Sequence, residues 1–175
     1  MFAAVARVVR AVSVPVSADV EDGYGLAPAE LVERLLEAGV VGCNLEDSEG
    51  HVTLKDPQRR ADWLAEVRAA AGDALVINAR VDTFLFGSGD PADAIARAKL
   101  YVAAGADCVY PLRAPTEFLP TLREGITGPL NMAAGPSPDS VAELARHGAT
   151  RITFGPGMQR YAMGAISDLA ANLRA

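Results

Sequence analysis

The chain has 175 residues, half of them apolar and 22% charged, which is enough to bury one sizeable core, so we expect a single domain over residues 1–175. Its 16 basic and 22 acidic residues give a formal net charge of −6 without a basic cluster that could follow a phosphate backbone, which argues against nucleic acid as a partner. No apolar stretch reaches the roughly 18 residues of a membrane helix, so we expect no membrane partner and predict a cytoplasmic location.

A unit made of a helix followed by a strand repeats along the chain after an opening helix and a first strand at 14–21. Pro28, Asp56 with Pro57, and Asp90 with Pro91 each begin an amphipathic stretch that a glycine ends. The apolar runs that follow are interpreted as strands. Further units repeat the pattern to the C-terminus. The expected elements are strands within 40–46, 74–82, 106–112, 129–132 and 149–157, and later helices over 116–124, from Ser137 to Gly148 and from about Met158 onward.

About six apolar strands alternating with helices predict an α/β fold with a parallel sheet covered by helices. The pattern fits either an open doubly wound sheet or an incomplete (β/α)₈ TIM-type barrel, since a full barrel needs eight strands. The chain contains no GxGxxG or GxxxxGK[ST] motif, which removes the usual nucleotide-binding support for the open sheet.

Acidic residues end two successive strands. Asp19 and Glu21 are two positions apart, so they share a face, and Glu46 ends the next strand. Carboxylates that converge at one sheet edge repel one another unless a cation joins them, and Mg²⁺ suits a site with few protein oxygens. The alternative, equally weighted on pattern alone, is a set of solvated loop carboxylates in which Asp47 or Ser48 caps a turn.

Arg80 ends the third of these strands, with Asp82 on the same face. Its planar fork suits a substrate carboxylate or a developing oxyanion, although a structural Arg–Asp pair explains the pattern as well. Asn131 is a weaker candidate for a neutral donor to the same pocket. These residues predict a small-molecule carboxylate as the substrate.

Other reactive side chains fit structural roles better. Cys43 and Cys108 lie in apolar runs, where a thiol usually serves as a small core residue. His51 and His147 lack zinc-ligand spacing and are interpreted as exposed loop or helix-end residues. The Gly155–Gly157 segment could present amides to a phosphate, but tight turn geometry is the favoured reading.

Six motifs occur in a fixed order: PVSADVEDGYG, GCNLEDS, LVINARVDTFL, AGADCVYPL, PLN and FGPG. Together they resemble the isocitrate lyase and phosphoenolpyruvate mutase superfamily, and most closely its phosphonomutase-like bacterial members. The resemblance covers nearly the whole chain. It implies a (β/α)₈ barrel that binds Mg²⁺, with Mn²⁺ as an alternative, and that cleaves or rearranges C–C or P–C bonds of small 2-oxo acids through an enolate-like intermediate.

The resemblance also implies residue roles. The family's metal carboxylates fall on Asp19, Glu21 and Glu46, and its active-site arginine falls on Arg80. Position 21 is Asp in the better-known members, which leaves direct or water-mediated ligation open. The expected substrate-binding residues are Arg80, Asn131 and Tyr24.

Two departures restrict these expectations. The loop after Glu46 lacks the catalytic Cys of the lyase branch, and Ser48 replaces the Lys of the mutase branch. The first two strand–helix units of the family are also missing, so the chain is expected to match barrel strands three to eight. Exposed strand edges would then favour oligomerisation, aggregation or an open structure, and of these we expect a homo-oligomer. The alternative function is a non-catalytic remnant that needs a partner or the missing segment to fold and act.

Overall fold

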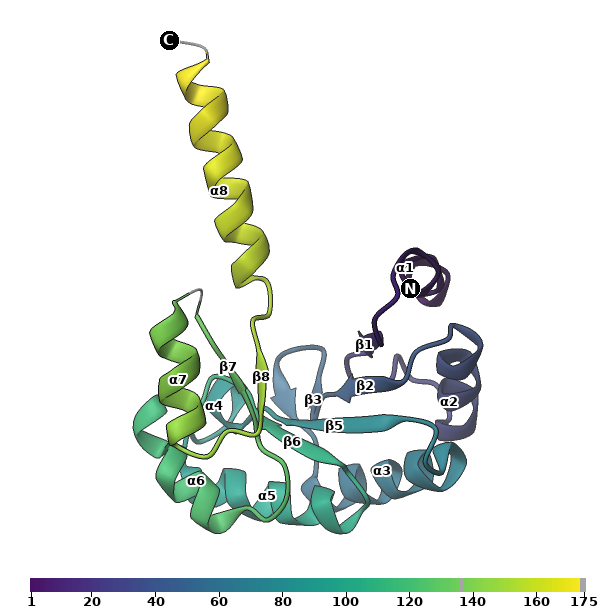
Figure 1. Cartoon of the computed structure of the whole chain (residues 1–175). Helices are drawn as coiled ribbons and strands as arrows, with labels where there is room; N and C mark the ends of the chain where they lie inside the picture. The colour runs from purple at the N-terminus through teal and green to yellow at the C-terminus, as the bar shows by residue number, and fades with distance from the viewer. Residues whose placement is uncertain (136, 174–175) are drawn as a thin grey trace.

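A computed structural model describes residues 1–135 and 137–173 of the chain. Six strands run parallel and alternate with helices, as the sequence predicts (Figure 1). Four of them form one sheet in the order β1-β2-β5-β6, and the other two pair with each other. A single bridge between Val109 and Leu130 links the pair to the sheet. The parallel strands are β1 (Ser17–Asp19), β2 (Gly42–Leu45), β5 (Val76–Val81), β6 (Cys108–Pro111), β7 (Asn131–Ala133) and β8 (Arg151–Thr153).

The helices begin where the sequence signals predict. The side chains of Asp56 and Asp90 accept hydrogen bonds from backbone N–H groups of the first turn, and a proline follows each of them, which satisfies donors that a helix start leaves unpaired. The helices are α1 (Phe2–Ala11), α2 (Pro28–Glu37), α3 (Pro57–Ala71), α4 (Thr83–Phe86), α5 (Pro91–Ala103), α6 (Leu119–Gly125), α7 (Pro138–Arg146) and α8 (Gly157–Asn172), with a 3₁₀ turn, η1 (Thr116–Phe118), before α6.

The two faces of the sheet differ in chemistry. Along β5, Ile77, Ala79 and Val81 alternate with Asn78 and Arg80, and the apolar set belongs to the hydrophobic core. Helices α3, α5 and α6 cover one side of the sheet (Figure 1). Their buried apolar side chains complete that core, and these include Leu64, Val67, Ala94, Ala98, Leu119 and Leu122. The polar residues of the strands are therefore left on the other face.

A short hairpin and helix α4 were not predicted from the sequence. The hairpin pairs β3 (Ser48–Glu49) with β4 (Thr53–Leu54) and follows β2 directly. Gly50 and His51 form its turn with positive φ angles of 58° and 56°. Because each hairpin strand has only two residues, no alternation of apolar and polar positions marks it in the sequence. The hairpin brings His51 back toward the end of β2.

The sheet does not close into a barrel within the described residues, where β1 and β8 form the two ends of the strand array. This confirms the prediction of an incomplete TIM-type barrel. Helix α8 extends away from the body, and α1 lies at the margin of the fold against α2 (Figure 1). Neither helix has a buried residue. Among the described residues, no helix combines the length and apolarity needed to cross a membrane.

Candidate active site

Strict register places polar residues of neighbouring strands side by side. Asp19 is level with Asn44 on β2, and Asn44 is level with Asn78 on β5. Asn78 Nδ2 donates to Asn44 Oδ1 at 2.7 Å, and Asn44 Nδ2 donates to Asp19 Oδ2 at 3.4 Å. Arg80 is level with Tyr110 on β6. The polar face of the sheet is therefore a connected surface that leads to the carboxyl ends of the strands.

The three predicted metal carboxylates lie at this edge. The side chains of Asp19 and Glu21 are about half exposed, at 50% and 46%, whereas that of Glu46 is 4% exposed. His51 lies between two of them, with Nε2 at 3.4 Å from Glu21 and Nδ1 at 3.2 Å from Glu46. Arg80 Nη1 lies 4.0 Å from Asp19 and donates to Glu46. Glu46 is thus a buried carboxylate rather than a solvated loop residue.

Arg80 is held on two sides. Its Nε and Nη2 atoms donate to the fully buried Asp82 at distances of 3.0 to 3.1 Å, and its Nη1 donates to Glu46. Ser48 Oγ also donates to Asp82 at 2.8 Å. The side chain of Arg80 is 9% exposed, so its orientation is fixed by charge-assisted hydrogen bonds in a site with little water. Both readings of Arg80 are compatible with this geometry, since a structural pair with Asp82 also orients it toward the acidic edge.

A second buried hydrogen-bond network, centred on Asp47, holds the backbone of Asp82 in place. Asp47 accepts from the backbone N–H of Asp82 at 2.8 Å and from the hydroxyl of Tyr101 at 2.8 Å. Arg97 Nη1 donates to Asp47 at 3.2 Å and to the carbonyl of Lys55 at 3.0 Å. Asp47 is fully buried and joins β2, β5, α5 and the hairpin, so it does more than cap a turn.

Burial and neighbouring charge set the electrostatics of the edge. Burial raises the pKa of Glu46, and the charge of Arg80 opposes that shift, while Asp82 and Asp19 add to it. Burial and the nearby carboxylates of Glu21 and Asp19 also raise the pKa of the Tyr24 phenol. A site with these properties favours a cationic ligand beside its carboxylates.

The carboxylates fit Mg²⁺ only as a site with few protein ligands. In the part of the chain that the structure describes, no three His, Cys, Asp or Glu side chains stand close enough to hold a metal ion together. Mg²⁺ is commonly bound by one or two carboxylates while waters and substrate oxygens complete its octahedron. Asp19 and Glu21 are exposed enough for that role, and Glu46 is partly occupied by Arg80.

The two remaining predicted substrate residues lie in different places. The Tyr24 hydroxyl donates to Glu21 at 3.4 Å, beside the acidic edge. Asn131 is fully buried at the start of β7, where its side chain exchanges hydrogen bonds of 3.2 Å with Thr153 on β8. Among the residues that the structure describes, no hydrogen bond joins Asn131 to Arg80. Leu130 bridges to Val109, which precedes Tyr110 on the strand next to Arg80.

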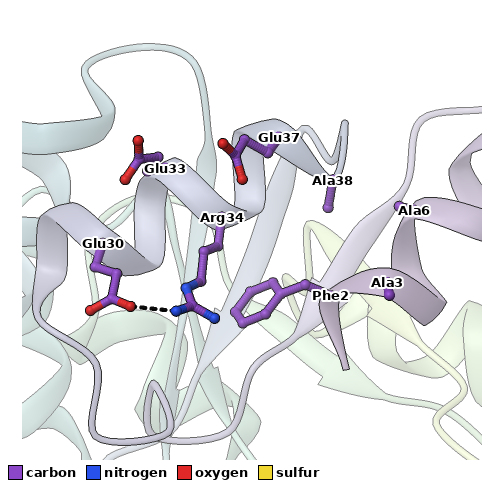
Figure 2. Close-up of a pocket in the computed structure, with 8 residues that line it drawn as sticks. All are labelled: Phe2, Ala3, Ala6, Glu30, Glu33, Arg34, Glu37 and Ala38. Atoms are coloured by element: carbon purple, nitrogen blue, oxygen red, sulfur yellow. Dashed lines mark hydrogen bonds and ion pairs between the residues drawn. The ribbon is translucent and has the colours of Figure 1, made fainter.

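A hollow of about 500 Å³ lies between α1 and α2, away from this edge. Figure 2 shows its lining, in which Arg34 pairs with Glu30 at 2.6 Å and lies over the ring of Phe2. The other side chains drawn there are acidic or alanine. This hollow is distant from the strand ends in the fold and holds none of the predicted site residues.

A family model described as phosphoenolpyruvate phosphomutase matches residues 1–174. The chain belongs to this family. It is 34% identical over 142 residues to an uncharacterized protein of Mycobacterium tuberculosis, a match covering 80% of this chain and 54% of that protein. It is 29% identical over 162 residues to 2-methylisocitrate lyase of Halalkalibacterium halodurans, covering 86% of this chain and 50% of the lyase. The chain therefore spans about half the length of these curated relatives.

Solved structures of the phosphoenolpyruvate phosphomutase family share the fold. A Burkholderia cenocepacia protein described as a "putative phosphonomutase" is 35% identical, with a TM-score of 0.85 over 98% of this chain and 74% of that one. Phosphonopyruvate hydrolase, 22% identical, has a TM-score of 0.85 over 99% of this chain and 65% of its own. The family match confirms the predicted superfamily, and the relatives and structural neighbours carry descriptions as lyases, hydrolases and mutases.

Sequence reasoning missed several residues of the site in this family member. His51 was interpreted as an exposed loop residue, and it is about half exposed, but it also contacts two carboxylates. Its position after a glycine in a short polar loop gave no sign of the left-handed turn that aims it. Asn44 and Tyr110 could have been found, because each is level in register with a predicted site strand residue.

Proposed function

We propose that this chain carries the metal and arginine part of a Mg²⁺-dependent lyase or phosphonomutase-like enzyme, with Mn²⁺ as an alternative metal. Its substrates would be small 2-oxo acids or related carboxylates, in which a C–C or P–C bond is cleaved or rearranged. The proposal rests on the position of Arg80. Asp82 and Glu46 fix its side chain at the edge where the side chains of Asp19 and Glu21 are about half exposed. A phosphonopyruvate hydrolase of the same fold, 23% identical, was crystallised with oxalate and Mg²⁺.

Each residue has a distinct role in this proposal. Asp19 and Glu21 would hold the metal, with Glu46 reaching it directly or through water, and the metal would polarise the substrate carbonyl. Arg80 would bind the substrate and stabilise the negative charge that develops during an enolate-like step. Asp82 holds Arg80 in place by accepting hydrogen bonds from its Nε and Nη2 atoms at 3.0 to 3.1 Å. Tyr24 would donate a hydrogen bond at the rim, and Asn131 is proposed as a neutral donor from β7.

We further propose that the protein is a homo-oligomer that acts in the cytoplasm. Helix α8 supports the first part, because its apolar side chains are exposed in the single chain and apolar surface of that extent favours burial against a partner. These side chains are Met158, Tyr161, Met163, Ile166 and Leu169. Size-exclusion chromatography with light scattering tests the oligomer, and a strictly monomeric elution across micromolar concentrations would contradict it.

Metal binding tests the proposed centre directly. Isothermal titration of the purified chain with Mg²⁺ should give a saturable site, which Asp19→Ala and Glu46→Ala weaken by about tenfold or more, since each removes a charged ligand or its support. Glu124→Ala on α6 is the matched control, because Glu124 is exposed and lies outside the cluster. Unchanged Mg²⁺ affinity in both site variants would remove the metal role.

A non-catalytic remnant is the alternative function. It keeps the fold and the acidic edge but turns over no substrate without another chain or segment. An assay of the 175-residue chain with Mg²⁺ against oxaloacetate, 2-methylisocitrate and phosphonopyruvate separates the two. Turnover that disappears in Arg80→Lys would support the enzyme, because a lysine keeps the charge but loses the two-pronged fork. Intact Mg²⁺ binding without turnover would favour the remnant.

A further inference from the structure

Two polar side chains in the same row of the sheet as Arg80 have no role so far, Tyr110 on β6 and Arg151 on β8. Arg80 is level with Tyr110, and Asn131 is level with Arg151 in the β7–β8 pair. The bridge that joins β6 to β7 lies one residue before Tyr110 and Asn131, which makes these two level as well. A single row across four strands therefore runs from Arg80 to Arg151.

The side chains of this row lie on the polar face of the sheet. Val109, Leu130 and Ile152 each adjoin a member of the row in sequence, and all three contact the hydrophobic core. Because side chains alternate along a strand, Tyr110 and Arg151 point to the opposite face. Both residues therefore share the face that carries the acidic edge.

The donors of Tyr110 and Arg151 are unused. Within the part of the chain that the structure describes, the Tyr110 hydroxyl makes no hydrogen bond, and the Arg151 side chain makes neither a hydrogen bond nor an ion pair. Arg151 Nη1 is enclosed without a partner, whereas Arg151 Nε and Nη2 and the Tyr110 hydroxyl are not enclosed. Arg151 is partly exposed as a whole. A small ligand can therefore reach both side chains from solvent.

Arg80 and Arg151 differ in how their charges are compensated. Arg80 donates to Asp82 and to Glu46, so two carboxylates already balance it. Arg151 has no such carboxylate within 4.0 Å among the described residues. Burial raises the pKa of the Tyr110 phenol, and the positive charges of Arg80 and Arg151 oppose that rise without reversing it. The phenol therefore keeps its proton at neutral pH and stands beside an uncompensated cation.

We propose that Tyr110 and Arg151 bind an anionic group of the substrate that does not touch the metal, and that they thereby select substrates with two anionic groups over those with one. This inference rests on the function proposed for the acidic edge. Two strand spacings of about 4.8 Å separate Tyr110 from Arg151, so both long side chains can reach one carboxylate or phosphonate between them. The open Nε–Nη2 side of Arg151 supplies two parallel N–H donors, and the phenol adds a third.

Three ligands of matched chain length test this selection. Butyrate has one anionic group, succinate adds a carboxylate and 3-phosphonopropionate adds a phosphonate. Isothermal titration of the 175-residue chain in Mg²⁺ should give a dissociation constant about tenfold lower or more for at least one of the two dianions than for butyrate, as expected for hydrogen bonds to a charged group. The tighter dianion identifies the second group. Equal constants for all three ligands, or no binding of any, would overturn the proposal.

Two substitutions assign the selection to its residues. Arg151→Gln should reduce the preference over butyrate by about tenfold or more and leave the dissociation constant of butyrate unchanged. Tyr110→Phe removes one neutral donor and should reduce the preference by about threefold. Arg146→Gln, at an exposed position on α7, is the matched control and should keep the full preference. Circular dichroism verifies the fold. A folded Arg151→Gln variant with the full preference would overturn the proposal, and Tyr110→Phe decides in the same way should Arg151→Gln fail to fold.

Mg²⁺ titration separates this inference from the proposed metal centre. Neither Tyr110 nor Arg151 belongs to that centre, so both variants should bind Mg²⁺ as the wild type does. Intact Mg²⁺ binding without a preference for dianions would contradict the role of Tyr110 and Arg151 alone. A preference for dianions in a chain that binds no Mg²⁺ would support that role and contradict the metal centre.

Discussion

The two parts of the molecule differ in how they are stabilised. In residues 17–111, strands β2, β5 and β6 are almost fully buried, and charged side chains such as Asp47 and Asp82 are enclosed with their partners. In residues 131–173, β8 is only partly buried and α8 has no buried residue. The central strands of the first part are therefore held by buried contacts on both faces. The second part carries an exposed apolar surface, so its stability depends on what covers α8.

The largest effect is expected from Asp82→Ala. It leaves Arg80 buried with only one of its two carboxylate partners and also removes the acceptor of Ser48, so the free energy of unfolding should fall by about 3–5 kcal/mol. Urea unfolding followed by circular dichroism measures the loss. Asp168→Ala on the exposed face of α8 is the control and should change the value by less than about 0.5 kcal/mol. Equal losses would remove the contrast between the two parts.

Two leucines compare the parts through packing alone. Leu64 in α3 is 1% exposed and Leu169 in α8 is 61% exposed. Leu64→Ala should lower the free energy of unfolding by about 2–5 kcal/mol because it opens a cavity in the core. Leu169→Ala should change it by less than about 0.5 kcal/mol when measured on dilute protein. A loss for Leu169→Ala that grows with protein concentration would instead locate Leu169 in an interface between copies.

A smaller, pH-dependent contribution comes from the Asp22–Lys55 pair, which ties the segment after β1 to the hairpin. Partial burial raises the pKa of Asp22, but the hydrogen bond and charge of Lys55 outweigh it, and the net shift is downward. A lowered carboxyl pKa adds stability above the unfolded value of about 3.9, and this is lost as the pH falls through the folded value. Asp22→Asn should cost at most about 1 kcal/mol at pH 7 and nothing near pH 2.

The smallest effect concerns the cysteines, which both lie in the first part. Burial raises the pKa of Cys43 to about 12 and that of Cys108 to about 11. Both thiols should react with a disulfide reagent at pH 8 only after unfolding, because the thiolate is the nucleophile. Their contribution to stability is lost as the pH rises from the unfolded thiol value of about 8.5 toward the folded values. Rapid labelling of the native protein would contradict this burial.

The sequence predicted the elements well wherever local signals were strong. Asp56 and Asp90 begin helices, and the apolar runs around Ile77 and Val109 are strands. Helix caps and short apolar runs are local signals, so a few neighbouring residues are enough to recognise them. The hairpin was missed because its two-residue strands carry no periodicity. The contacts of His51 could not be predicted, since they depend on a turn conformation that neither composition nor spacing encodes.

The candidate site was predictable to a different degree. Strand alternation brought Asp19, Glu46 and Arg80 to one edge, and the structure places them there. Their metal and catalytic roles stay predictions. The buried partners of Asp47 could not be found, because Arg97 and Tyr101 lie on a helix far along the chain and only the packing of α5 on the sheet joins them to it.

The level alignment of Asp19, Asn44 and Asn78 across three strands has a consequence for how this lineage can change. Inserting or deleting one residue within β2 would turn Glu46 toward the helices and bring Leu45 or Asp47 to the acidic edge, because side chains alternate along a strand. Length variation should therefore be confined to segments between the elements, such as the hairpin turn. We therefore expect related chains to align without gaps through all three strands and to differ in the length of the hairpin.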